Sequence, residues 1–103
     1  MLISKGASVG EVVSIKLISG EEIIARLEEE NTDYIKVSRP LTVSLGPQGL
    51  GMIPFVFLAQ NDTMRLNMNH VMVLAAAKKD AADQYIQGTT GIALKWVKSL
   101  DKL

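Results

Sequence analysis

The sequence predicts an all-β domain: a small, strongly bent five-stranded barrel followed by a C-terminal helical extension. Three observations lead to this prediction. Apolar and polar residues alternate over most of the first 75 residues, which is the period of a strand with one buried face. Short turns rich in Gly, Asn and Asp separate the alternating runs. After residue 75 the composition changes to helix formers.

Length and composition set the domain organisation. The chain has 103 residues, the size of one domain, with a lead-in over 1–10, the barrel over 11–75 and the helical extension over 76–103. Hydrophobic residues make up 48% of it, so we expect another subunit to cover part of the apolar surface. Eleven basic and eleven acidic residues give a formal net charge of zero, which argues against a strongly basic protein that coats DNA.

Several classes of site and location are excluded or disfavoured. The chain contains no cysteine, so disulfides, thiolate metal sites and cysteine nucleophiles are absent. The first residues include no apolar segment of signal-peptide length. No apolar run approaches the ~20 residues that cross a bilayer. We therefore expect a soluble, cytoplasmic protein with no membrane partner.

The first two strands are predicted at about 11–18 and 22–30, joined by a turn in which Gly20 can take a positive φ at little cost. One face of each strand is apolar: Val13, Ile15 and Leu17, then Ile23, Ala25 and Leu27. The small Ala25 suits a strand that bends sharply. Ile24 interrupts the polar face of the second strand.

The third strand is predicted at about 34–45, after a turn at 31–33 whose side chains can bond their own backbone. Its apolar positions keep one phase except at Arg39-Pro40. Because Pro40 cannot donate a hydrogen bond to a neighbouring strand, we expect a bulge or an edge position there.

The fourth and fifth strands are predicted at 52–59 and 64–75. Both contain more apolar surface than one small barrel can bury. We therefore expect their edges to pair with a neighbouring chain. Beyond them, residues 76–88 favour a helix, and residues 91–103 favour an amphipathic helix with an apolar stripe of Ile92, Leu94, Trp96, Val97, Leu100 and Leu103.

No catalytic pattern is found. The glycines at 46–51 lie between two strands, whereas a phosphate-binding loop joins a strand to a helix. The single histidine, His70, excludes a multi-histidine metal site, and no nucleophile motif accompanies it. The carboxylates at 21–22 and 28–30 are typical of solvated strand ends. We predict no enzyme activity and no metal or other cofactor.

Two segments resemble known motifs. The run from Ile15 to Leu27, with its Gly20 turn, followed by Asp33-Tyr34-Ile35-Lys36-Val37, resembles the first conserved motif of the Sm/LSm family of RNA-binding rings. Met68-Asn69-His70-Val71-Met72 is similar to the short second motif, most closely in the Hfq branch. That branch has a lysine-histidine pair where this chain has Asn69-His70. Ala25 stands where the family usually has glycine.

The resemblance implies a non-catalytic homo-oligomeric ring that binds single-stranded RNA and acts in RNA metabolism or regulation. Subunits would join through the fourth and fifth strands around a central pore. Tyr34 would stack on a base. The resemblance further implies base or phosphate contacts from a set of polar residues: Asn69, His70, Lys36 and Arg39.

Other interpretations of the same residues remain open. Tyr34 is also a common β-former, and His70 is in phase with neighbouring apolar residues, which favours a hydrogen-bonded, partly buried side chain. Trp96 is typical of a packing residue. The zero net charge and Asn69 in place of lysine favour an alternative function, a ring that serves only as a structural or assembly scaffold.

Overall fold

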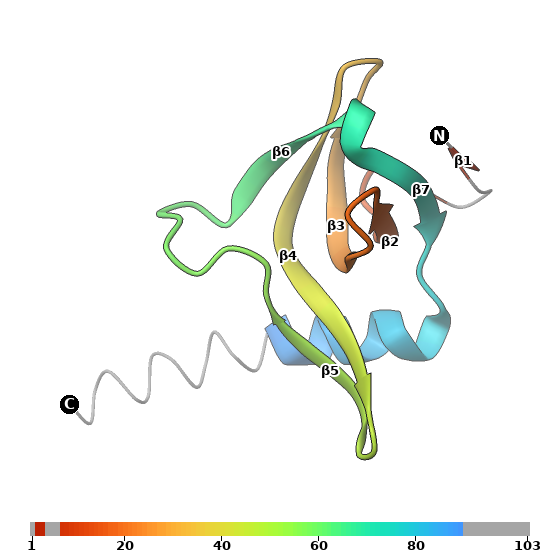
Figure 1. Ribbon diagram of the computed structural model, residues 1–103, viewed down its shortest axis with the longest axis vertical. Helices are drawn as coiled ribbons and strands as arrows, with labels where there is room; N and C mark the ends of the chain where they lie inside the picture. The colour runs from red at the N-terminus through yellow and green to blue at the C-terminus, as the bar shows by residue number, and fades with distance from the viewer. Residues whose placement is uncertain (1, 4–6, 90–103) are drawn as a thin grey trace.

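The fold is one strongly bent, mostly antiparallel sheet with a helix against part of it (Figure 1). The computed structural model describes residues 2–3 and 7–89. Its elements are β1 (Leu2–Ile3), β2 (Val12–Leu17), β3 (Glu22–Glu30), β4 (Tyr34–Gly46), β5 (Gly49–Pro54), β6 (Thr63–Asn67), the 3-10 helix η1 (Met68–His70) and β7 (Val71–Ala76). A helix covers residues 79–89. The predicted all-β class, the strong bend and the helix after the sheet are confirmed.

The strand order is β1-β7-β2-β3-β4-β5, with β6 also paired to β4. The sheet has seven strands rather than five, and one extra strand arises because η1 divides the predicted fifth strand into β6 and β7. β4 is long enough to pair with two partners. Its first half pairs with β6 and its second half with β5. The short β1 adds the remaining strand, parallel to β7.

The β2–β3 hairpin follows the alternation of its sequence. Gly20 has a φ of +100°, as its turn requires. The apolar faces of both strands are buried inside the bend, together with residues of β4 and β7: Val13, Ile15, Leu17, Ile23, Ala25, Leu27, Ile35, Val37, Val71 and Leu74.

A bulge in β4 confirms the predicted break at Arg39-Pro40. Ile24 pairs with Leu41 and Arg26 pairs with Ser38, so two residues of β4 lie opposite the single Ala25 of β3. A bulge of this kind bends the strand and increases its twist. The bulge separates the half of β4 that pairs with β6 from the half that pairs with β5.

A second, smaller core lies on the other face of the sheet, under the helix over residues 79–89. It consists of Val12, Ile24, Leu41 and Tyr85. Ile24, the residue that interrupts the polar face of β3, is therefore buried beneath the helix. The Tyr85 hydroxyl lies 3.0 Å from the carbonyl oxygens of both Ser38 and Arg39, which ties the helix to the bulge.

Several predicted boundaries are wrong. The strand predicted to begin at residue 52 begins at Gly49, because β4 and β5 are joined by a tight turn at 47–48. The predicted strand at 52–59 ends at Pro54, and a loop follows to residue 62. The predicted strand at 64–75 is two strands, β6 and β7, separated by η1. The Asn67 side chain accepts a hydrogen bond from the backbone N–H of Asn69, and this local bond favours the 3-10 turn over an extended chain. Ala76 belongs to β7 and not to the helix.

The predicted amphipathic helix at 91–103, with Trp96, lies outside the described residues. Within the part of the chain that the structure describes, no helix is both long enough and apolar enough to cross a lipid bilayer.

Candidate nucleic-acid interface

The β3–β4 turn and η1 meet at one corner of the sheet (Figure 1). Tyr34, the first residue of β4, pairs with Asn67, the last residue of β6. One step further, the backbone N–H of Met68 donates to the carbonyl of Asp33 at 2.9 Å. We name this region, residues 31–34 and 65–70, the Tyr34 corner. It joins the two segments that resemble the Sm/LSm motifs.

The turn that leads into Tyr34 is held by Asn31. The Asn31 side-chain oxygen accepts hydrogen bonds from the backbone N–H groups of Asp33 and Tyr34, both at 2.9 Å. The Asn31 N–H donates to the Tyr34 carbonyl at 3.0 Å. These three bonds satisfy the turn locally and fix where the Tyr34 side chain leaves the backbone.

The Tyr34 ring is held in place by two side chains. Its hydroxyl donates to a carboxylate oxygen of Glu29 at 2.5 Å. The guanidinium carbon of Arg65 lies 4.6 Å from the ring centroid, within the range of a cation–π contact. An aromatic ring and a guanidinium plane in contact are the two kinds of surface on which unpaired bases stack in proteins.

The 3-10 turn η1 begins directly after Asn67, the residue that pairs with Tyr34. The Asn67 side chain starts the turn, and the His70 carbonyl accepts from the Ile18 N–H at 2.9 Å. Asn69 and His70 are exposed, and neither side chain bonds to another described residue. The interpretation of His70 as a partly buried side chain is therefore wrong, because η1 interrupts the strand at this point.

Lys36 lies close to Tyr34, whereas Arg39 does not. Lys36 is two residues further along β4, on the same face, and pairs with Arg65 of β6. Arg39 is about 16 Å from Tyr34 along the strand, beyond five residues of extended chain. Its Nε lies 3.2 Å from a carboxylate oxygen of Asp62. The structure thus places Tyr34 and Lys36 on one face of β4, with Asn69 and His70 in the adjacent η1. It leaves Arg39 beside Asp62.

The part of the Tyr34 corner that belongs to β6 was not predicted as a site: it contributes Arg65 and Asn67. Arg65 contacts Tyr34 because β6 pairs with the start of β4, a pairing that no local pattern indicates. The role of Asn67 could have been predicted from sequence, because an asparagine side chain can cap a turn and so end a strand.

The charge around the corner is mixed. Lys36 and Arg65 supply positive charge, while Glu29 and Asp33 are close by in the paired strand and the turn. Such a surface favours contacts with individual bases more than simple attraction of a phosphate backbone. Among the described residues, no three His, Cys, Asp or Glu side chains are grouped as a metal site.

No protein-family model matches this chain, and no curated protein matches its sequence. The chemistry of the Tyr34 corner and the surfaces at the ends of the sheet are therefore the basis for a functional proposal.

Proposed function

We propose that the chain assembles into a homo-oligomeric ring that binds single-stranded RNA at the Tyr34 corner without catalysing a reaction. The observation that supports this most directly is the contact between the β3–β4 turn and η1, made by the Met68–Asp33 hydrogen bond. The two segments that resemble RNA-binding motifs are distant in sequence and adjacent in space.

The side chains of the corner have the chemistry that unpaired bases need. A base can stack on the Tyr34 ring or on the Arg65 guanidinium, which contributes ~1–3 kcal/mol per base. Asn69 offers an amide donor and acceptor for a base edge, and His70 offers a ring nitrogen. Lys36, on the same face, suits a phosphate.

Assembly is supported by apolar side chains at both ends of the sheet. At one end, Phe57 and Leu58 are exposed in the loop between β5 and β6. At the other end, Met72 of β7 and Ile18 beside η1 are exposed. Contact between two different surfaces of identical chains is head-to-tail and closes into a ring when the rotation between subunits allows it.

The test combines a mass measurement with an RNA titration. We expect a mass in solution several times that of one chain, and binding of fluorescently labelled oligo-U or oligo-A at low salt that weakens as salt is raised. A monomer at all concentrations would contradict the assembly.

A scaffold ring with no RNA role is the second candidate. The zero net charge and the carboxylates of Glu29 and Asp33 near the corner favour it. Assembly without binding of either oligonucleotide at low salt would reject RNA binding and support the scaffold.

A further inference from the structure

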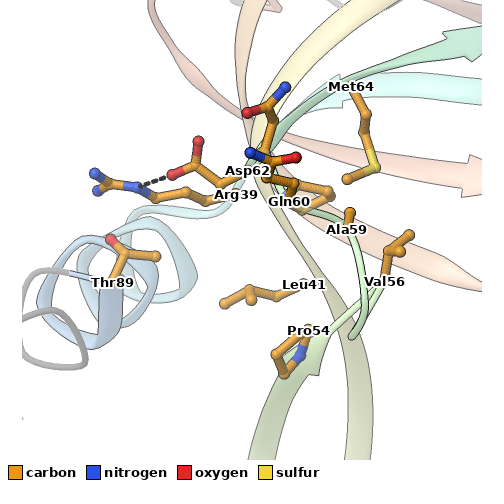
Figure 2. A pocket seen from close by; sticks show the side chains of 11 residues that line it. Arg39, Leu41, Pro54, Val56, Ala59, Gln60, Asp62, Met64 and Thr89 are labelled. Atoms are coloured by element: carbon orange, nitrogen blue, oxygen red, sulfur yellow. Dashed lines mark hydrogen bonds and ion pairs between the residues drawn. The ribbon is translucent and has the colours of Figure 1, made fainter. Parts of the chain in front are cut away.

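A pocket of about 340 Å³ lies at the β4 bulge, away from the Tyr34 corner (Figure 2). Much of its wall is apolar, with Leu41 and Pro54 from the paired strands and Val56, Ala59 and Met64 from the following loop and β6. Figure 2 shows the Arg39–Asp62 ion pair at one side, with Thr89 of the helix on that same side.

The bulge side of the pocket is fixed by several hydrogen bonds. Arg39 has a φ of 49°, a conformation that non-glycine residues rarely adopt. Its carbonyl lies within hydrogen-bond distance of the Tyr85 hydroxyl, and its backbone N–H donates to the Asp62 carbonyl. The adjacent Pro40 carbonyl accepts from the Phe55 N–H at 3.0 Å. The helix, β4 and the loop between β5 and β6 are therefore hydrogen-bonded to one another where they form the pocket.

Thr89 lies where the pocket meets the start of the C-terminal segment, residues 90–103. It is the last described residue and it lines the pocket. The sequence Gly88-Thr89-Thr90-Gly91 is poor in helix formers and favours a change of direction there. Ile92, the first residue of the apolar stripe, is three residues beyond Thr89 and so within about 10 Å of it.

We propose that residues 90–103 of the same chain dock in this pocket through their apolar stripe. The stripe supplies Ile92, Leu94, Trp96 and Val97 within the first eight residues after Thr89, and the pocket offers an apolar wall at the point where that segment begins. Val56 in the wall is 43% exposed among the described residues, and docking would cover it.

Charge is compatible with this docking. Lys95, Lys98 and Lys102 against Asp101 give residues 90–103 a net charge of +2. Because the whole chain is neutral, residues 1–89 have a net charge of −2. The segment and the rest of the chain therefore have opposite net charges. The proposal does not depend on RNA binding or on the ring.

Trp96 makes the proposal directly measurable, because it is the only tryptophan of the chain. In the full-length protein we expect blue-shifted Trp96 emission and slow quenching by acrylamide, both unchanged by dilution. Val56→Lys places a cation in the pocket wall and repels the lysines of the segment. We expect this variant to shift the emission to that of a solvent-exposed indole and to raise the quenching constant several-fold.

Two variants serve as controls. Leu58→Lys makes the same kind of change on the same loop, at a residue that is 96% exposed and does not line the pocket. Leu45→Lys places a lysine at a residue that is 84% exposed and lines the other large cavity, between the sheet and the helix. We expect Trp96 emission to stay blue-shifted in both.

Other outcomes would overturn the proposal. Solvent-like Trp96 emission in the unaltered protein, or emission unchanged by Val56→Lys, would reject docking in this pocket. Burial of Trp96 that is lost on dilution would assign the segment to a second copy of the chain. Circular dichroism checks that Val56→Lys folds, and Ala59→Lys, in the same wall, tests the same site if it does not.

Discussion

At the scale of single residues, Tyr34 and Arg65 form the surface on which the proposed function depends most. The Glu29 carboxylate orients the ring and the Arg65 guanidinium lies over it, so both groups are held in place before a base binds. Pre-ordered groups lose less entropy on binding than flexible ones. This is a physical reason to place the base at Tyr34 and not at the more mobile end of a lysine.

Tyr34→Ala should weaken oligonucleotide binding by about 5- to 150-fold, the equivalent of ~1–3 kcal/mol of lost stacking. Tyr34→Phe keeps the ring and loses only the hydroxyl bond to Glu29, so its affinity should stay close to that of the unaltered protein. Fluorescence anisotropy with labelled oligo-U and oligo-A measures both. Equal binding by the alanine and phenylalanine variants would show that the ring does not stack.

The candidate site could be predicted from sequence only where its residues belong to a local pattern. Tyr34, Asn69 and His70 follow from two local patterns. Arg65 could not be predicted, because its contact with Tyr34 requires the register between β4 and β6. Arg39, which the resemblance groups with Tyr34, lies beside Asp62 at the bulge.

At the scale of secondary-structure elements, the alternating pattern was sufficient for the β2–β3 hairpin and for the bulge, because Gly20 and Pro40 restrict the backbone locally. It failed between Phe55 and His70. Apolar content there suggested two long strands, but the strand ends at Pro54, and the Asn67 side chain turns the chain at η1. At η1, one hydrogen bond to the Asn67 side chain outweighed the apolar period.

The contact between Tyr85 of the helix and the β4 bulge gives a prediction about pH. Burial raises the pKa of the Tyr85 hydroxyl above its ordinary value of 10.0, although the nearby Arg26 and Arg39 partly oppose this. The folded state therefore favours the protonated form more than the unfolded state does. The resulting stability is fully present below pH 10.0 and is lost as pH rises through the raised pKa.

Tyr85→Phe should lower the free energy of unfolding at neutral pH by about 0.5–1.5 kcal/mol, because the hydrogen bond to the bulge is lost. Its stability should then fall less steeply at alkaline pH than that of the unaltered protein. Urea unfolding across the alkaline range measures both effects. In the control Tyr34→Phe, the alkaline decline should persist because Tyr85 is still present; a decline that also persists in Tyr85→Phe would rule out Tyr85 as its cause.

At the scale of the whole molecule, the two ends of the sheet differ. Among the described strands, β6 pairs only with β4, so its other edge is open to a second chain. At the opposite end, β1 pairs with Val73 and Leu74 of β7. A neighbour that adds to β7 would therefore have to replace β1 or bind beside it, which was not foreseen from the apolar content of the predicted fifth strand.

Phe57 provides the sharpest test of assembly, because it is 72% exposed in the loop that leads into β6. Burying a phenylalanine side chain between subunits is worth about 1.5–3 kcal/mol, and a carboxylate in its place would be left desolvated. Phe57→Asp should therefore reduce the mass in solution to that of one chain, with the circular dichroism spectrum unchanged. Val9→Asp makes the same change at an exposed residue in the turn before β2 and should leave the mass unaltered. Light scattering measures the mass of both variants. An assembly that survives Phe57→Asp does not use this loop.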